Sequence, residues 1–291
     1  MNIIETNHLT KYYGKARGII DSNLTVCEGD IFGFIGPNGA GKSTTIRLLL
    51  GMIYPTKGNS FIFGKDCAKH GVKIREEIGY MPSEAQFYSQ LRVEEAILLA
   101  AKLHNKDCRE EASSLCERFQ VDTKKKIEDL SLGNRKKVSI VCAMQHKPKL
   151  LILDEPTSGL DPLMQKEFFR VLHERNAEGA TIFLSSHVLP EIQQHCNQAA
   201  IIKEGKIIRC GNVDELVRSN AKRVSISGIH ALEGLENMFD VKEIEQGINF
   251  LYRGDMPTLL GACQGKPITD MTITEPSLEE MFLHFYEKEE A

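Results

Sequence analysis

The sequence has no hydrophobic run long enough to span a lipid bilayer. The longest stretch without Asp, Glu, Lys or Arg covers only the 12 residues from Gly179 to Pro190, whereas a membrane helix needs about 20 apolar residues. The first residues, Met1 to Asn7, also lack the basic and then apolar order of a secretory signal. We therefore expect a cytoplasmic protein with no transmembrane helix of its own.

Closely spaced cysteine pairs are missing as well. The eight cysteines include no C-x-x-C pair, so neither a zinc site nor a disulfide framework is encoded locally. The formal net charge is only -4, which gives the whole chain no strong attraction to nucleic acid or anionic lipid. Of the 291 residues, 42% are hydrophobic, which is enough to form one large or two modest domains.

What the sequence does contain is a glycine-rich loop of the phosphate-binding type. Gly36 and Gly41 are separated by four residues, and Lys42 and Ser43 directly follow Gly41. A short apolar run, Ile31–Ile35, precedes the loop and a helical pattern follows it, which is the context that this motif requires. Glycines let successive N–H groups turn toward one anion, and the helix N-terminus adds partial positive charge. The residues predicted to hold the nucleotide phosphates are Gly36, Pro37, Asn38, Gly39, Ala40, Gly41, Lys42, Ser43 and Thr44.

Short apolar strands alternate with helical patterns along much of the chain, which predicts an α/β fold with a parallel sheet covered by helices. The run Leu150–Leu153 is fully apolar, as in strands that are buried on both faces. A strand-like lead-in covers Asn2 to Val26, and helical spacing over about residues 86–146 predicts an inserted helical subdomain. We assign these features to one nucleotide-binding domain, residues 1–220.

Shorter strand and helix patterns begin again after Asn220. They predict a small α+β accessory domain at residues 221–291 in the order β-α-β-β-α-β, with its first helix near residues 232–238. After Pro276, an apolar stripe at helical spacing predicts a final helix.

Two acids directly follow the apolar run that ends at Leu153. Ligands of an α/β sheet bind at the carboxyl ends of its strands. Asp154 is therefore placed to hold magnesium through its water shell, and Glu155 to polarise an attacking water as a general base. His187 follows the next predicted strand and points to the same edge, where it contacts the γ-phosphate or orients Glu155. We predict Glu155, His187 and Lys42 as catalytic residues, and Ser43 and Asp154 as magnesium-binding residues.

A second anion-binding helix N-terminus is predicted at residues 130–134, where Ser131, Gly133 and Asn134 open a helix. The chain thus has two helix N-termini that are predicted to bind phosphate, but only one phosphate-loop lysine, Lys42. The second N-terminus is expected to bind a nucleotide that is held by another molecule, which predicts a sandwich dimer.

Together these motifs resemble those of the ATP-binding subunit of an ATP-binding cassette (ABC) transporter, over about residues 1–220. The matching segments are the phosphate loop, residues 130–134, the strand and acids at 150–155, the turn Ser158-Gly159-Leu160-Asp161, and His187. The resemblance implies that Tyr13 stacks on adenine and that Asp161 lies in a turn linking two nucleotide sites.

The same resemblance implies the cofactors and partners. They are ATP and Mg²⁺, a second nucleotide-binding subunit that is identical or different, and an integral membrane permease, with no nucleic acid. The expected location is the inner face of the cell membrane. The ending from Glu275 to Phe282 is similar to that of ABC-2 type exporters, so export is expected.

The sequence departs from the family pattern in two places. Leu132 replaces a glycine and Asn134 a glutamine in the signature-like loop. Ser83 stands where a glutamine is expected after Pro82. A serine can still hydrogen-bond a magnesium-bound water over a shorter reach, so we predict Ser83 at the metal, ahead of Gln86 as a substitute.

Two other functions fit parts of the sequence. A soluble cassette protein acting on ribosomes or nucleic acid has slight support from the basic clusters 124–126 and 135–137, although such runs usually form solvated faces. An ATP-dependent switch with little hydrolysis would follow if the departures at Leu132 and Ser83 had abolished turnover.

Overall fold

The computed structural model of the chain describes residues 1–217, 222–232 and 234–274. The chain divides into two compact units, Met1–Gly211 and Asn212–Ala291. The division falls within the last strand of the central sheet, β10 (Lys206–Asn212), ahead of the position that the sequence pattern favoured. Each unit is described by itself below.

A six-stranded sheet forms the centre of the first unit, in the order β10-β9-β3-β8-β7-β6. Strands β9, β3, β8, β7 and β6 are parallel. Their bounds are β3 (Ile31–Ile35), β6 (Ile78–Met81), β7 (Leu150–Asp154), β8 (Thr181–Ser186) and β9 (Gln198–Lys203). Every residue of β3, β7 and β8 is buried, which explains their apolar sequences.

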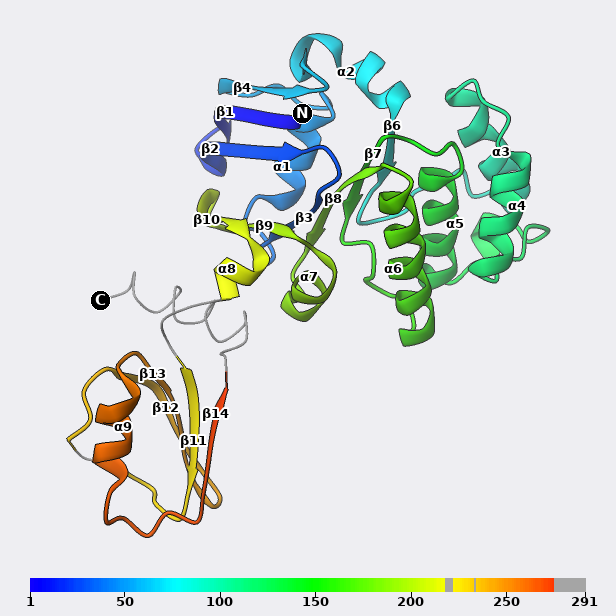
Figure 1. Cartoon of the computed structure of the whole chain (residues 1–291). Coiled ribbons are helices and arrows are strands. Elements are labelled where there is room, and N and C mark those ends of the chain that lie inside the picture. The colour runs from blue at the N-terminus through cyan, green and yellow to red at the C-terminus, as the bar shows by residue number, and fades with distance from the viewer. Residues whose placement is uncertain (218–221, 233, 275–291) are drawn as a thin grey trace. The chain divides into compact units, whose positions relative to one another are not determined.

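Helices cover this sheet, as Figure 1 shows. They are α1 (Lys42–Leu49), α6 (Pro162–Ala177) and α7 (Leu189–His195). Helix α1 contacts β2 and β4 of a second sheet as well as β7. The predicted parallel sheet covered by helices is confirmed.

The lead-in to the phosphate loop belongs to an antiparallel sheet in the order β2-β1-β4-β5. Its strands are β1 (Asn2–Tyr13), β2 (Ala16–Cys27), β4 (Lys57–Ile62) and β5 (Lys65–Asp66). Strands β1 and β2 join at Gly14, whose φ of 60° favours glycine in this tight turn. Helix α2 (Cys67–Glu77) follows β5. We did not predict α2, and non-helical angles at His70 show that it is kinked.

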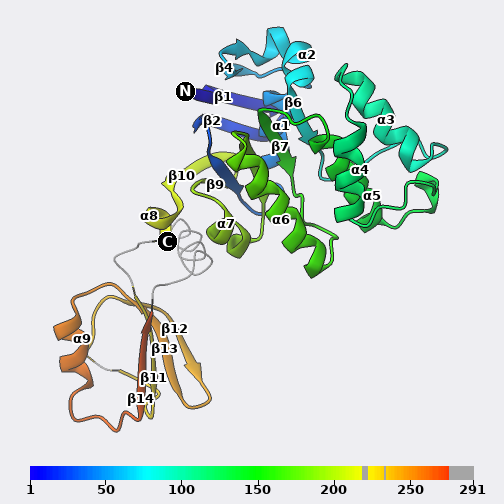
Figure 2. The ribbon, with the colours of Figure 1, turned by 45° about the vertical axis from the view of Figure 1, so that its right-hand side comes forward.

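The helical subdomain consists of α3 (Val93–Leu103), α4 (Arg109–Arg118), the short 3₁₀ helix Ile127–Asp129 and α5 (Leu132–Met144). Figure 2 shows α3, α4 and α5 beside one another. Helix α3 buries its apolar stripe of Val93, Ala96, Ile97 and Ala101, as expected of an amphipathic helix. These helices lie within the predicted range of residues 86–146.

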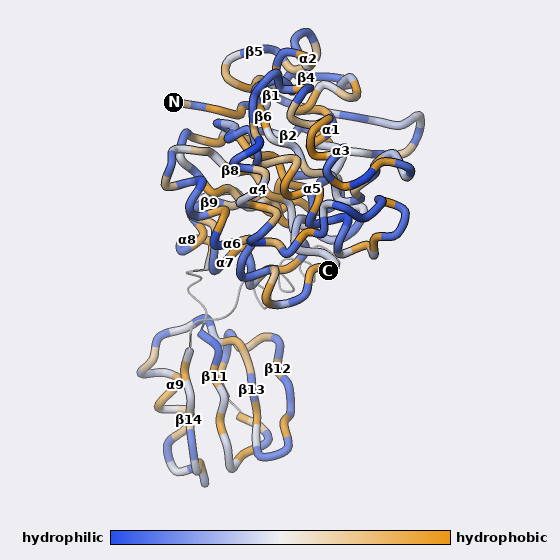
Figure 3. Tube along the Cα trace, turned by 90° about the vertical axis from the view of Figure 1, so that its right-hand side faces the viewer, coloured by the Kyte–Doolittle hydropathy of each residue, from blue (hydrophilic) through white to orange (hydrophobic). Residues whose placement is uncertain are grey.

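The second unit contains a four-stranded antiparallel sheet in the order β12-β13-β11-β14. Its elements are α8 (Val213–Val217), β11 (Lys222–Ser227), β12 (Met238–Ile244), β13 (Gly247–Tyr252), α9 (Met256–Cys263) and β14 (Asp270–Thr274). Hydrophobic residues alternate with polar ones along β11 (Figure 3). Val224 and Ile226 of this strand share a core with Phe250 and Leu259. The predicted small α+β domain is confirmed.

The helix predicted near residues 232–238 is wrong. The described residues between β11 and β12 form no helix, and Met238 begins a strand. Gly228 and Gly234 have φ angles of 95° and 81°, and Asn237 has a φ of 63°, so left-handed backbone interrupts the segment. The final helix predicted after Pro276 lies outside the described residues.

Candidate active site

The phosphate loop connects β3 to α1 at the carboxyl edge of the central sheet. Gly41 adopts a φ of 113° immediately before α1, and a β-carbon there would lie 2.7 Å from Ile19. A β-carbon on Gly36 would lie 2.4 Å from the Ile202 carbonyl oxygen. Side chains at these glycines would collide with the fold, so the loop keeps a bare backbone of the kind that can approach a phosphate.

The lysine of the loop is buried and is held at the base of this backbone. Lys42 is only 6% exposed, and its Nζ donates to the Gly36 and Pro37 carbonyl oxygens at 2.6 and 3.2 Å. The same Nζ lies 3.1 Å from Glu155 Oε1. The predicted catalytic lysine and glutamate are therefore neighbours.

Glu155 has a strained backbone that turns its carboxylate toward the loop. Its φ is 49°, a left-handed conformation that costs a non-glycine residue about 1–3 kcal/mol. Its N–H lies 3.1 Å from Ser185 Oγ. The buried Glu155 Oε1 makes no hydrogen bond of good geometry with the described residues, but the Lys42 ammonium lies beside it as an ion-pair partner. The buried carboxylate is therefore compensated by the charge of the loop lysine.

The other oxygen of this carboxylate contacts the predicted histidine. His187 Nδ1 and Glu155 Oε2 are 2.6 Å apart, and His187 remains half-exposed at 49%. When Glu155 is ionised, its oxygen accepts the hydrogen bond and Nδ1 carries the proton, which fixes the tautomer of the ring. Two roles were open for His187, contact with the γ-phosphate or orientation of Glu155. In the structure its ring contacts Glu155.

Asp154 lies at the end of β7 and is almost completely buried, at 3% exposure. Ser185 Oγ donates to Asp154 Oδ1 at 2.5 Å. A buried carboxylate next to the phosphate loop is chemically suited to Mg²⁺, which prefers oxygen ligands.

A cavity of about 270 Å³ joins the phosphate loop to some of the other predicted residues, whereas Asp154 and His187 are not among the residues that line it. Tyr13, Lys42, Ser43, Ser83 and Glu155 all contribute to its wall. Gln86, the alternative to Ser83, is not among the residues that line this cavity. Sequence reasoning missed two further residues of the wall, Arg17 and Gly18. No local motif marks these two residues, because they reach the cavity only when β2 pairs with β1 beside Tyr13.

The residues of the second predicted phosphate end lie outside this cavity and form a separate group. Ser131 Oγ accepts from the Asn134 N–H at 3.3 Å and caps α5. Asp161 caps α6 by accepting from the Leu163 and Met164 N–H groups. The two caps are close, since a β-carbon on Gly133 would lie 2.7 Å from the Gly159 carbonyl oxygen. Within one chain, the two predicted phosphate-binding segments therefore lie apart.

Comparison with known proteins decides the family. Residues 19–158 match the profile of the ABC transporter domain. The bacitracin transport ATP-binding protein BcrA of Bacillus licheniformis is 38% identical over 296 residues, which cover 97% of this chain and 96% of that protein. The chain belongs to the ABC transporter ATP-binding proteins.

Other similarities agree with this assignment. The linearmycin resistance ATP-binding protein LnrL of Bacillus subtilis is 29% identical over 97% of both chains. A solved structure of an ATP-binding subunit of an ABC transporter superposes with a TM-score of 0.71 and 31% identity, covering 74% of this chain and 92% of that one.

This cassette protein is therefore an ATPase subunit that powers a separate membrane component. In the part of the chain that the structure describes, no helix is long and apolar enough to cross a membrane. Subunits of this family pair with a membrane permease and form dimers. The similarities give no support to a protein acting on ribosomes or nucleic acid, nor to a switch with little hydrolysis.

One basic residue of the cassette is buried where the sequence predicts exposure. The cluster 135–137 was expected to be a solvated face, but Lys136 is only 2% exposed. Its Nζ donates to the Ser83 carbonyl oxygen at 2.7 Å. Burial lowers the pKa of Lys136, while Asp154, Glu155 and Glu84 act in the opposite direction.

Proposed function

We propose that this cassette binds MgATP through the phosphate loop and hydrolyses it by in-line attack of a water that Glu155 polarises. The observation that carries this proposal is the position of Glu155, held between Lys42 at 3.1 Å and His187 at 2.6 Å in the wall of the cavity. The carboxylate is the general base, and His187 holds it in orientation through Nδ1. Tyr13 stacks on the adenine ring at the open side.

Mg²⁺ would be held by the hydroxyl of Ser43 and, through water, by Asp154 and Ser83. Bound there, it neutralises charge on the β- and γ-phosphate oxygens. The buried Asp154 carboxylate, fixed by Ser185, and the presence of Ser43 and Ser83 in one cavity support this donor set.

The second nucleotide-binding element serves a partner cassette. In this head-to-tail dimer, Lys42 of one subunit and Ser131 of the partner subunit hold the same ATP, and Gly133, Asn134 and Asp161 complete that interface. Hydrolysis removes the shared phosphate contact and lets the dimer open. The separation of the two elements within one chain supports this arrangement. Residues 1–220 would form the cassette and residues 221–291 an accessory domain.

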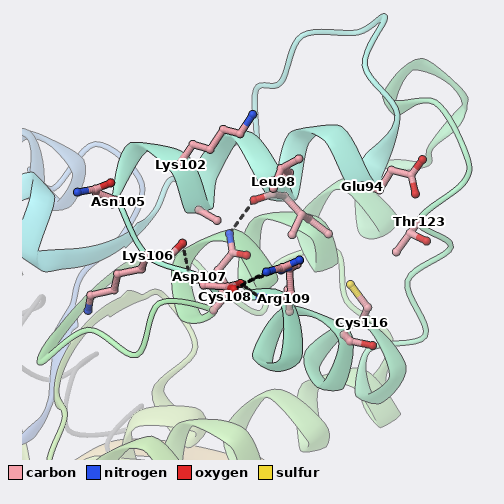
Figure 4. Close-up of a pocket in the computed structure, with 15 residues that line it drawn as sticks. Glu94, Leu98, Lys102, Asn105, Lys106, Asp107, Cys108, Arg109, Cys116 and Thr123 are labelled. Carbon is pink, nitrogen blue, oxygen red and sulfur yellow. Dashed lines mark hydrogen bonds and ion pairs between the residues drawn. The ribbon is translucent and has the colours of Figure 1, made fainter.

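The partner in the membrane would dock on the helical subdomain. Helices α3 and α4 enclose an open pocket of about 590 Å³ (Figure 4). Its wall includes Ile97, Leu98, Ala112 and Cys116, and Leu98 is 47% exposed. Gln145 also lines the pocket, and its Oε1 is buried and accepts no hydrogen bond from the described residues. An apolar segment with one hydrogen-bond donor, presented by the permease on the inner face of the membrane, fits this chemistry.

The transported substrate would be an antibiotic-like compound that the permease exports. The names of the relatives in Bacillus licheniformis and Bacillus subtilis, which concern bacitracin transport and linearmycin resistance, support this choice. To test it, this chain and its permease are expressed in a sensitive host, and the lowest inhibitory concentrations of such compounds are measured. Unchanged sensitivity to the whole set would contradict the assignment.

The hydrolytic roles are tested by Glu155→Gln. This change keeps the shape of the side chain but removes the general base, so turnover is expected to fall by at least about 100-fold, while ATP-dependent dimers accumulate. Phosphate release and size-exclusion chromatography in ATP measure the two effects. Retained hydrolysis, or a variant that stays monomeric in ATP, would overturn the roles given to Glu155.

A further inference from the structure

Lys136 is a buried cation beside the active site that the mechanism above does not use. It lies in α5, shortly after the Ser131 cap, and is 2% exposed. Lysine is almost never fully buried unless its ammonium has a partner. Here the partner is the Ser83 carbonyl oxygen, 2.7 Å from Nζ.

The hydrogen bond joins two parts of the cassette that are far apart in sequence. Helix α5 belongs to the helical subdomain, and its first residues lie beside the turn at Gly159. Ser83 follows β6 at the edge of the central sheet and lines the same cavity as Lys42 and Glu155. A displacement of α5 would therefore move the Ser83 backbone, and with it the wall of the cavity.

The charges around Lys136 strengthen this link. Asp154 and Glu155 at the end of β7 and Glu84 beside Ser83 all attract the ammonium. Glu155 is already engaged by Lys42 and His187 on its other sides. Among the described residues, none of these three acids forms a direct ion pair with Lys136, so its contact with the site passes through the backbone at Ser83.

The position of this contact coincides with a departure from the family pattern. A glutamine side chain is expected at residue 83, and the serine present is shorter. We propose that Lys136 is a positioning residue for ATP hydrolysis: its ammonium fixes the Ser83 segment against the carboxylates and couples α5 to the catalytic cavity. This inference rests on the proposed hydrolytic role of Glu155.

Three variants at position 136 distinguish the effect of the charge from the effect of packing. They are Lys136→Met, Lys136→Arg and Lys136→Gln. Methionine keeps most of the apolar stem but loses the donor and the charge, whereas arginine keeps both. In Lys136→Met we expect kcat to fall about tenfold or more while KM for ATP stays within about twofold, because a small displacement near the reacting groups costs mainly turnover. Lys136→Arg should recover most of kcat.

Lys166→Met is the matched control, because Lys166 is an exposed lysine in the second turn of α6. Its kinetics should equal those of the wild type. Thermal unfolding and titration with a fluorescent ATP analogue, run on all variants, establish that each is folded and binds nucleotide. If Lys136→Met does not fold, the shorter neutral Lys136→Gln takes its place.

Two results would overturn the inference. One is wild-type kcat in a folded, neutral variant at position 136. The other is an arginine variant that folds but is as defective as the neutral ones, which would show that packing alone matters. Glu155→Gln in the same assay separates this inference from the proposed function. If that variant hydrolyses ATP, the proposed function fails; if it is inactive while Lys136→Met is not, only the inference about Lys136 fails.

Discussion

Gly133 and Gly159 touch through their backbones. A β-carbon on Gly133 would lie 2.7 Å from the Gly159 carbonyl oxygen, closer than two such atoms can approach without a shift. Gly133 opens α5, and Gly159 lies in the turn that leads to Asp161 and α6. The contact therefore fixes the relative position of the two segments that we assign to the dimer interface.

The first prediction concerns Gly133→Ala. The added methyl group forces the turn at Gly159 to move, at a cost of about 1–3 kcal/mol, and should weaken the ATP-dependent dimer while ATP binding by the single subunit is kept. Dimer formation is measured by size-exclusion chromatography in a Glu155→Gln background. Gly211→Ala is the control, since a β-carbon there meets no atom within 4 Å. An undiminished dimer in Gly133→Ala would contradict the assignment of this face.

The second prediction concerns the aromatic ring at the open side of the nucleotide cavity. Tyr13 lines the cavity and is 45% exposed. Removing the ring in Tyr13→Ala should raise KM for ATP about tenfold, which corresponds to the upper range of aromatic stacking energies. Tyr13→Phe keeps the stacking face and should stay close to wild type. Tyr54→Ala, an exposed tyrosine outside the cavity, is the control, and equal KM values in all four proteins would exclude stacking at Tyr13.

The parts of the site that follow strands directly could be predicted from the sequence. Strand-ending positions fix where a side chain emerges, so Glu155 and His187 were expected at one edge, and they lie 2.6 Å apart. The loop lysine and Ser83 lie in one cavity for the same reason.

Other features depend on contacts between distant segments, which a local pattern does not contain. Arg17 reaches the cavity only because β2 pairs with β1, and Lys136 is buried only because α5 packs against the Ser83 segment. Helix α2 is interrupted by non-helical angles at His70 and contains Gly71, a poor helix former. In the second unit, the predicted helix near residues 232–238 is absent because Gly228 and Gly234 adopt left-handed angles, which the local composition does not indicate.

The third prediction concerns stability at acidic pH. His146 is 3% exposed, and its ring stacks on that of His104 at 3.6 Å. Its Nε2–H donates to the Ile78 carbonyl oxygen at 3.1 Å. Burial, helped by the charges of His104 and Lys106, lowers the pKa of His146 to about 4. In the unfolded chain His146 keeps its ordinary pKa of 6.5. Between the two pKa values, the unfolded chain therefore binds a proton at His146 that the folded protein does not.

The stabilising contribution of neutral His146 is complete above pH 6.5 and is lost as the pH falls toward 4. Between pH 7 and pH 5 this single group should remove about 1–2 kcal/mol from the free energy of unfolding. Urea denaturation at both pH values measures the loss. His146→Gln should be less stable at pH 7 but show a smaller loss on acidification, whereas His70→Gln, at an exposed position, should keep the wild-type loss. An identical loss in His146→Gln would assign the pH dependence to other groups.

The fourth prediction tests the docking of the permease on the helical subdomain. Leu98 lines the pocket between α3 and α4 and is 47% exposed, so Leu98→Asp leaves the fold intact but places a charge in the apolar contact. Because burying an unpaired charge costs several kcal/mol, co-purification of the membrane subunit should fall at least about tenfold. ATP binding by the free cassette should not change. Leu260→Asp, which alters a leucine on α9 that is 55% exposed, is the control. Normal co-purification of Leu98→Asp would mean that the permease binds elsewhere.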